Sequence, residues 1–300
     1  MTTEDTRRLW ANFFQFSYNS YTEDAVACGR PDYDYLSYKP FLRWDDALWD
    51  ELTREMASAG VTHVVLSLGD GIRYESHPEI AVDGAWTPAE MRSEIARLKV
   101  MGIEVIPKLN FSTGHDLWLG DYARMVSTPT YYQVCSELIA EVIAIFDTPA
   151  LFHLGYDEET AQHQSWYEYV VIRQHDLWWR DFLWFVEQVE SRGSRPWIWS
   201  DFIWDHTGEF LQRMPRSVVQ SNWYYGPNFD LEIDARQAAE RGIDLSRSLQ
   251  EGRDHTTPLH AYLDLEAGQF DQILTGSTWQ ADENFPDTVT WAQEHLHPSS

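Results

Sequence analysis

Short apolar runs alternate along this chain with longer segments in which apolar residues recur every three or four positions. In the first of the longer segments Trp44, Leu48, Leu52 and Met56 show this spacing, which predicts a helix with one buried face. The pattern predicts strands at residues 13–18, 61–68, 103–110, 150–154, 196–201, 217–223 and 270–279. It predicts helices at residues 45–59, 88–100, 131–146, 176–191, 259–265 and 288–295. Strands and helices that alternate in this way are typical of α/β folds with a parallel sheet.

The 300 residues contain no internal linker and no hinge rich in Gly and Ser, so one domain over residues 1–300 is expected. Repeated strand–helix units in a chain of this length predict a TIM-type (β/α) barrel, with a doubly wound open sheet as the alternative. No G-x-G-x-x-G motif and no phosphate-binding loop follows a predicted strand. Nucleotide-binding folds therefore lose support, and no cofactor is expected.

A closed TIM-type barrel has eight strands, but the pattern supplies seven. After Trp279 there remain a polar loop, one short predicted helix and Pro298-Ser299-Ser300, none of which is an apolar run. An open sheet leaves two unpaired strand edges, so a missing strand needs an explanation. We favour an incomplete barrel whose eighth strand is missing at the C-terminus. The alternatives are an extra strand supplied by the first-strand region, a chain that is a fragment, or a strand missed by the count within residues 230–258.

The charge balance narrows the choice of partners. The chain has 48 acidic residues against 22 Lys and Arg, which gives a formal net charge of −26. Nucleic acids and anionic membranes need a basic face, so neither is expected as a partner. No apolar run approaches the ~20 residues of a membrane helix, and the N-terminus lacks the order of a secretion signal, which favours a cytoplasmic location. Cys28 and Cys135 form neither a metal motif nor a disulfide framework.

Two adjacent carboxylates follow the most apolar of the predicted strands. The strand at residues 150–154 ends at Gly155, and Asp157 and Glu158 come directly afterwards. This position is just past the carboxyl end of a strand, where α/β folds place their catalytic groups. The alternative is a solvated loop before a helix, since carboxylates are favoured near helix N-termini. Aromatic and polar residues recur at the other strand ends, which favours the catalytic interpretation.

The aromatic content indicates the kind of ligand. The chain has 15 Trp, 15 Tyr and 14 Phe, and several of them lie at predicted strand ends beside Asp, Asn or His. Aromatic faces stack on the C–H faces of sugar rings, while polar neighbours bind the hydroxyl groups. Many of these aromatic residues must nevertheless be core. The combination favours a carbohydrate substrate, and it does not indicate the oligomeric state.

Two motifs in the middle of the chain together resemble family 20 glycoside hydrolases, the β-N-acetylhexosaminidases. Gly102-Ile103-Glu104-Val105-Ile106-Pro107, with Gly114-His115 after it, resembles the G-I-E-V-I-P-E … P-G-H stretch of that family. His153-Leu154-Gly155-Tyr156-Asp157-Glu158 resembles its H-x-G-G-D-E signature. The order of the motifs and the single helix between them also match, and the resemblance extends over residues 61–225. It implies a (β/α)8 barrel that hydrolyses β-linked glycans containing N-acetylhexosamine.

The resemblance also implies roles for the two carboxylates. Glu158 would be the general acid/base, and Asp157 would orient the 2-acetamido group of the substrate, which itself attacks the anomeric carbon in a retaining mechanism. Neighbouring residues on one strand end are poorly placed to flank a glycosidic bond from opposite faces, so a nucleophile supplied by the substrate suits this pair. We expect a partly desolvated pocket to raise the pKa of Glu158, so that it carries a proton when substrate binds.

Substrate-binding candidates lie at the ends of other predicted strands: His115, Trp199, Asp201, Trp204, Trp223 and Tyr225. The three Trp residues suit a sugar pocket, with Trp223 favoured for stacking. Tyr225 or its neighbour Tyr224 would bind the acetamido oxygen. His115 is either a site residue or a surface residue, and Asp201 is either a ligand or a helix cap.

The chain departs from the family pattern at several positions. Tyr156 replaces the second Gly of the signature, Lys108 replaces the Glu after Pro107, and Thr113 replaces the Pro before Gly-His. No Arg is found near the end of the first strand. Two alternatives therefore stay open, namely a glycosidase for another sugar and a non-catalytic carbohydrate-binding protein. A metal-dependent hydrolase using His115, His153, Asp157 and Asp201 is a third, but the usual His-x-His is missing and no metal site is expected.

Overall fold

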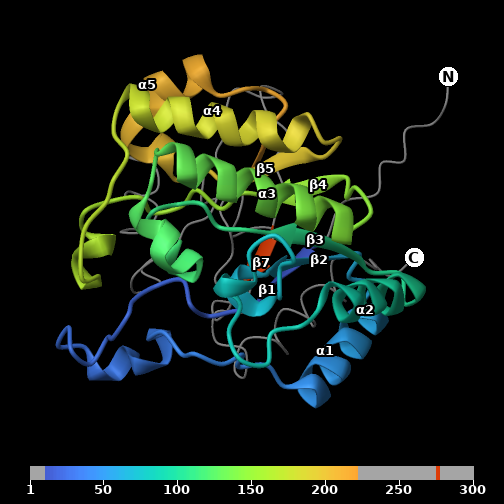
Figure 1. Cartoon of the computed structure of the whole chain (residues 1–300). Coiled ribbons are helices and arrows are strands. Elements are labelled where there is room, and N and C mark those ends of the chain that lie inside the picture. The colour runs from blue at the N-terminus through green and yellow to red at the C-terminus, as the bar shows by residue number, and fades with distance from the viewer. Residues whose placement is uncertain (1–10, 222–274, 278–300) are drawn as a thin grey trace, which may run out of the picture.

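The computed structural model describes residues 11–221 and 275–277, which form a parallel α/β fold (Figure 1). The strands are β1 (Ala11–Gln15), β2 (His63–Ser67), β3 (Glu104–Lys108), β4 (Leu151–His153), β5 (Arg195–Trp199), β6 (Val219–Ser221) and β7 (Thr275–Ser277). The α-helices are α1 (Asp46–Ala59), α2 (Pro88–Val100), α3 (Pro129–Ile145), α4 (Asp176–Glu190) and α5 (Phe202–Arg213). Short 3-10 helices are η1 (Pro31–Leu36), η2 (Gly69–Gly71), η3 (Pro78–Ile80), η4 (Leu117–Arg124) and η5 (His163–Trp166).

The strands β1 to β6 follow one another in the sheet in chain order, and every pair is parallel. The three-residue β7 pairs with the other side of β1, so the order is β6-β5-β4-β3-β2-β1-β7. In-order parallel strands with a helix after most of them are the product of repeated right-handed crossovers. Their carboxyl ends therefore all meet at one edge of the sheet.

The sheet is strongly curled. Phe13 on β1 and Trp199 on β5 are in edge-to-face contact, with ring centroids 5.7 Å apart. Three strands separate β1 from β5, and a flat sheet would hold these two strands about 19 Å apart at about 4.8 Å per strand. Curling thus brings the inner-face side chains into one cluster: Ala11, Phe13, Val65, Ile106, Trp197, Trp199 and Val219. This arrangement is that of a partial (β/α) barrel.

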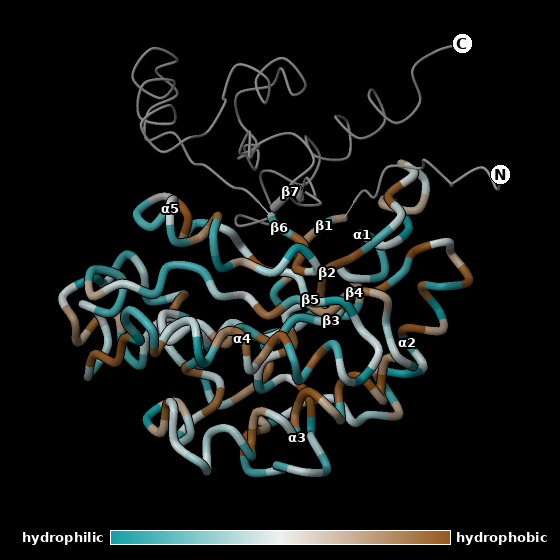
Figure 2. The backbone as a smooth tube through the Cα atoms, turned by 90° about the horizontal axis from the view of Figure 1, so that it is seen from above, coloured by the Kyte–Doolittle hydropathy of each residue, from teal (hydrophilic) through white to brown (hydrophobic). Residues whose placement is uncertain are grey.

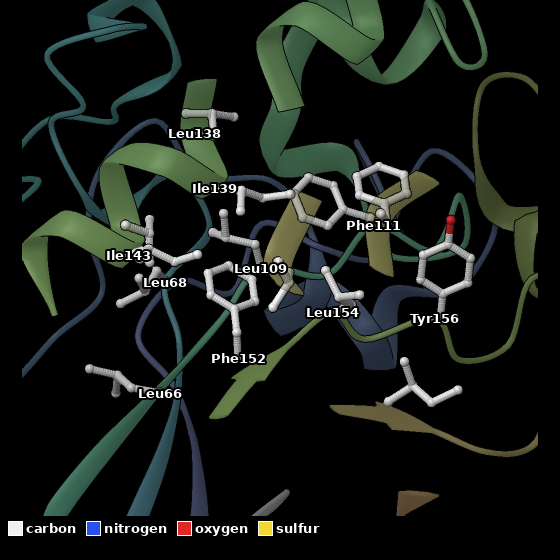
Figure 3. Close-up of a cluster of buried hydrophobic side chains, with 14 of the residues drawn as sticks. Leu66, Leu68, Leu109, Phe111, Leu138, Ile139, Ile143, Phe152, Leu154 and Tyr156 are labelled. Carbon is white, nitrogen blue, oxygen red and sulfur yellow. The ribbon is translucent and has the colours of Figure 1, made fainter. Parts of the chain in front are cut away.

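The helices pack on the outer face of the curled sheet, in an arc around the strands (Figure 2). Figure 3 shows part of this layer, where Leu138, Ile139 and Ile143 of α3 meet side chains from the strands and the residues that follow them. Local signals fix the helix ends: Thr87 and Glu90 form a capping box before α2, and Gly60 ends α1 with a φ of 82°. In the described residues, no helix is both long and apolar enough to cross a membrane.

The first six predicted strands and the first four predicted helices are confirmed, with shifts of a few residues at their ends. Helix α5 is missing from the prediction, although Ser200 and Asp201 separate it from β5; its backbone departs from helical geometry at His206. Of the predicted strand at 270–279, the structure describes residues 275–277, which form β7. The predicted helices at 259–265 and 288–295 lie outside the described residues, as does the segment 230–258. The seven-strand count and the missing eighth strand therefore stay predictions.

Candidate active site

The carboxyl ends of three neighbouring strands bring the candidate catalytic residues together. Asn110 and His115 follow β3, Asp157 and Glu158 follow β4, and Asp201 follows β5. The three strands are adjacent in the sheet, so loops that are more than 40 residues apart in the chain meet here. The predicted grouping of Asp157, Glu158, His115 and Asp201 is thus found in the structure.

The loop that carries the two carboxylates has an uncommon backbone. Gly155, Tyr156 and Glu158 have φ values of 73°, 70° and 56°. This left-handed conformation costs about 1–2 kcal/mol for each residue other than Gly, so contacts with neighbouring residues must stabilise the loop. A Cβ atom on Gly155 would lie 1.9 Å from Oδ1 of Asn110, so this position requires Gly.

Packing explains how Tyr156 stands where the resembling family has Gly. Its ring is buried and makes edge-to-face contacts with Trp178, Phe182 and Phe185, all on α4. Its hydroxyl accepts a hydrogen bond of 2.9 Å from Arg173. Burial of an aromatic ring stabilises by more than the left-handed backbone costs. The substitution therefore keeps the loop geometry that places Asp157 and Glu158.

Both carboxylate oxygens of Asp157 are occupied. Oδ1 accepts a 2.8 Å hydrogen bond from Nδ2 of Asn110, and Oδ2 lies 3.3 Å from Nε2 of His115. Oδ1 of Asn110 in turn accepts from the backbone N–H groups of Ser112 and Tyr156. Because the amide is fixed on both sides, Asp157 has one defined orientation at the edge of the sheet.

Glu158 lies between two imidazoles. Its Oε2 is 3.1 Å from Nε2 of His115, and its Oε1 is 3.1 Å from Nε2 of His163. Burial would raise the pKa of Glu158, but hydrogen bonds from these two imidazoles and their positive charges lower it to about 2. The predicted rise in this pKa is therefore wrong for the protein without substrate. The reason is that His115 and His163 both pair with Glu158, and the sequence pattern does not connect His163 of η5 with the site.

His115 bridges the two carboxylates and is almost fully buried. Burial lowers the pKa of this imidazole, but the charges of Asp157 and Glu158 outweigh it and raise the pKa above its ordinary value. The rings of Tyr21 and His115 are also in edge-to-face contact, with centroids 5.2 Å apart. Of the two interpretations of His115, the structure therefore supports the site residue over the surface residue.

Asp201 precedes α5, but its side chain makes no capping hydrogen bond there. Its Oδ2 instead accepts the backbone N–H of Glu158 at 2.8 Å. Desolvation, together with the charges of Asp157 and Glu158, raises the pKa of Asp201 to about 7. The helix-cap interpretation of Asp201 is thus wrong, and the residue supports the loop that carries Asp157 and Glu158.

The remaining candidates lie in the inner cluster, on helix α5 or outside the described residues. Trp199 is buried in the inner cluster, between Phe13 and His153. His153 is fully buried, and its Nδ1 accepts the backbone N–H of Gly155, which is a structural role. Trp204 lies on α5. Trp223 and Tyr225 lie outside the described residues, so their assignment to the sugar pocket stays a prediction.

Arg173 holds the far side of the loop that carries Asp157 and Glu158, and no sequence motif marks this residue. Its Nε and Nη2 donate to the two oxygens of Glu159 at 3.0 and 2.6 Å. It also donates to Tyr156 and to the carbonyl oxygen of Phe111. The side chains of Arg173 and Glu159 are only 1% and 2% exposed. Residues on both sides of the Asp157–Glu158 pair are thus fixed by one guanidinium.

We expect Arg173→Met to lower the free energy of unfolding by about 3–5 kcal/mol, because Glu159 would become a buried charge without its partner. Urea unfolding followed by circular dichroism measures this change. The control is Arg54→Met, since Arg54 is exposed on α1 and forms no buried ion pair. Equal stability of the two variants would contradict the role of Arg173.

His115, Asp157 and Glu158 bring three possible metal-ligand atoms within 4.8 Å of one another. The imidazole–carboxylate distances of 3.1 and 3.3 Å are those of direct ion pairs, so we assign no metal to this cluster. The four side chains expected for a metal-dependent hydrolase do not come together as one cluster in the part of the chain that the structure describes. His153 points its Nδ1 at the Gly155 amide, and Asp201 binds the Glu158 amide.

No protein-family model matches this chain, and no curated protein matches it significantly. Its fold is similar to solved structures of family 20 glycoside hydrolases. Chitobiase from Flavobacterium johnsoniae is 16% identical over 93% of this chain and 48% of its own, with a TM-score of 0.56. The family 20 catalytic modules of the pneumococcal exo-β-D-N-acetylglucosaminidase are 13% identical over 96% of this chain and 84% of their own, with a TM-score of 0.53.

The β-N-acetylhexosaminidase from Bacteroides fragilis NCTC 9343 is 17% identical over 78% of this chain, with a TM-score of 0.50. The chain spans 40–48% of the length of the first four solved structures it matches. At these identities the likeness establishes the fold. The described part of the chain therefore has the α/β fold of family 20 catalytic domains, in the form of a partial barrel.

Proposed function

We propose that this protein is a glycoside hydrolase that cleaves β-linked N-acetylhexosamine from glycans by a retaining, substrate-assisted mechanism. The observation that supports it most is the pair Asp157–Glu158 at the carboxyl end of β4, with Asp157 fixed by Asn110 and His115. The fold shared with family 20 catalytic domains is consistent with this assignment. All of these residues follow β3 and β4, so the proposal does not depend on whether the barrel closes.

In the proposed first step, the acetamido oxygen of the substrate attacks the anomeric carbon while Glu158 gives its proton to the departing glycosidic oxygen. The carboxylate of Asp157 accepts the acetamido N–H and stabilises the positive charge that develops on that group. In the second step, Glu158 takes a proton from water, and the water oxygen opens the cyclic intermediate at the anomeric carbon. The sugar leaves with its original configuration, and Glu158 is protonated again.

This mechanism requires a proton on Glu158, yet the low pKa of Glu158 leaves it ionised in the free protein. The ion pairs with His115 and His163 must therefore loosen when substrate binds, or one imidazole must pass its proton to Glu158. The His163 side chain is 45% exposed, so this pair is the one that a sugar can displace. Substrate binding also removes water from Glu158, which favours its protonated form.

We expect His163→Gln to shift the alkaline limb of the kcat/KM profile to higher pH. Removal of one positive neighbour raises the pKa of Glu158, so the protonated acid persists at a higher pH. Initial rates from pH 4 to 9 on one N-acetylhexosaminide measure the shift. A profile that stays in place would show that His163 does not control the proton on Glu158.

The direct test is hydrolysis of a panel of chromogenic β-glycosides with and without a 2-acetamido group. The proposal expects release of the chromophore from acetamido sugars and inhibition by a thiazoline analogue of the intermediate. A soak of that analogue into crystals would place it against Asp157 and Glu158. Turnover of 2-hydroxy sugars alone would instead indicate a glycosidase for a different sugar.

A non-catalytic carbohydrate-binding protein is the second candidate, and the ionised, doubly paired Glu158 favours it. Calorimetry with N-acetylhexosamines distinguishes the two. Binding without release of any chromophore would support the binding protein and contradict the hydrolase.

A further inference from the structure

A cavity of about 550 Å³ opens at the amino ends of three neighbouring strands. His63, Glu104 and Leu151 line it, and they are the first residues of β2, β3 and β4. These strands are parallel, so Asp157 and Glu158, which follow the carboxyl end of β4, lie at the other edge of the sheet. Cavities of about 300–1,000 Å³ are the usual size of small-ligand sites. The cavity is therefore large enough for a ligand and separate from the candidate active site.

The inner surface of this cavity is mostly apolar. Helix α2 forms one wall, and the end of α3 with the turn before β4 forms another. An apolar molecule that covers such a surface removes it from water, which favours binding. The buried and half-buried apolar side chains that line the cavity are Ile95, Ile103, Val105, Ile145, Phe146 and Leu151.

Two cations lie on the α2 wall of the cavity. Arg92 and Lys99 are seven residues apart, about two turns, and share one face of the helix. Both side chains are exposed, and within residues 11–221 neither forms an ion pair or a hydrogen bond. Arg97 on the same helix, by contrast, is paired with Glu94 at 2.6 Å. The α2 wall thus carries two positive charges that this part of the chain does not neutralise.

Two carboxylates line the cavity away from α2. The side chain of Glu104 is 69% exposed and lies 3.6 Å from the imidazole of His63. Asp147, in the turn after α3, is exposed as well. Neither carboxylate is paired with Arg92 or Lys99 in the described part of the chain. An anionic ligand group therefore finds its partners on α2, whereas a cationic group would bind near Glu104 or Asp147.

The turn between α3 and β4, which forms one wall, has a strained backbone. Asp147 and Thr148 have left-handed φ values of 56° and 55°. This conformation is uncommon for a β-branched residue such as Thr. Strained residues persist where the surrounding structure holds them, and they cluster at ligand sites. The strain supports a functional interpretation of this wall.

We propose that this cavity is a ligand site for a small amphiphilic carboxylate, that is, a molecule with an apolar body and one anionic group. The apolar body lies against Ile95, Ile145 and Phe146, and the carboxylate accepts hydrogen bonds from Arg92 or Lys99. Hydrogen bonds from guanidinium and ammonium groups to a carboxylate are stronger than those between neutral groups. The inference does not depend on the proposed function, because no residue of the candidate active site lines the cavity.

The test is isothermal titration of the full chain with three probes that share one apolar body: 4-phenylbutanoate, 4-phenylbutan-1-ol and 4-phenylbutylamine. We expect the carboxylate to bind about tenfold more tightly than the alcohol, the gain expected from a hydrogen bond to a charged group. The amine should bind most weakly. Equal Kd values for the carboxylate and the alcohol would overturn the inference. Tightest binding of the amine, or no binding of any probe, would overturn it too.

Removal of the two positive charges tests the role of the α2 wall. In the double variant Arg92→Gln and Lys99→Gln, the Kd of the carboxylate should rise to that of the alcohol, and the Kd of the alcohol should stay the same. Arg54→Gln is the matched control, since Arg54 is exposed on α1 and outside the cavity. It should leave all three Kd values unchanged. A double variant that still prefers the carboxylate would contradict the assignment.

A second pair of variants tests the position of the ligand. Ala96 is exposed on α2 and lines the cavity, so Ala96→Trp fills the cavity without loss of a buried contact. It should abolish binding of all three probes. Ala89→Trp, exposed on the same helix but outside the cavity, should not. Both variants should unfold at the wild-type temperature in circular dichroism. Probe binding that survives Ala96→Trp would place the probe elsewhere in the protein and would overturn the inference.

Discussion

Glu158→Gln should lower kcat by about 10²–10⁴-fold on N-acetylhexosaminides with poor leaving groups, the usual contribution of a general acid. Glutamine has the same shape, so the loop should keep its backbone. The loss should be smaller for a nitrophenyl leaving group, which departs without a proton. Steady-state kinetics on both kinds of substrate measure this difference.

Glu168→Gln is the matched control for this experiment. Glu168 belongs to the same long loop between β4 and α4, but its side chain is 67% exposed. We expect its activity to equal that of the wild type, with unchanged circular dichroism for both variants. Near-normal turnover of poor leaving groups by Glu158→Gln would remove Glu158 from the mechanism.

The second large effect is expected at Asp157. Asp157→Asn should reduce turnover of 2-acetamido substrates by about 10²–10³-fold, because the amide cannot stabilise the positive charge that develops on the acetamido group. Residual turnover of 2-hydroxy substrates should change much less, since those sugars have no group for Asp157 to orient. The ratio of kcat/KM for matched acetamido and hydroxy substrates measures this selectivity.

Asp121→Asn serves as the control, since Asp121 is exposed in η4 on a neighbouring loop. Two results would contradict the assignment of Asp157. One is a covalent sugar adduct trapped on Asp157 and identified by mass spectrometry. The other is full wild-type activity on glycosides without an acetamido group, which would transfer the nucleophilic role to another carboxylate such as Asp201.

Much of the fold could be predicted because local patterns and global architecture agree. Strands β1 to β6 are short apolar runs, and helices α1 to α4 show helical spacing with clear stop signals such as Gly60 and Gly102. Only two residues lie between β5 and helix α5, whose backbone departs from helical geometry at His206, so the local pattern does not separate the helix from the end of the strand. The curl of the sheet depends on contacts such as Phe13 with Trp199, which no local pattern contains.

The site was predictable where it depends on strand ends and unpredictable where it depends on loop contacts. Asp157, Glu158, His115 and Asp201 each follow a strand, and parallel strands bring their carboxyl ends together. Arg173 and His163 come from the long loop after β4, which folds back over the strand ends. Their positions depend on how that loop packs, so the sign of the pKa shift at Glu158 could not be read from the chain.

The close approach of Asn110 to Gly155 restricts the substitutions that both positions can accept during evolution. Position 155 cannot acquire a side chain while the Asn110 amide occupies the space beside it. Loss of the amide alone would release Asp157, because Asn110 donates directly to that carboxylate. A Cβ at position 155 would also lie 2.9 Å from the Cα of Asn110, and φ there is 73°, so loss of the amide does not make room for a side chain. We therefore expect deep mutational scanning for activity to show that neither position accepts changes and that changing both together restores nothing.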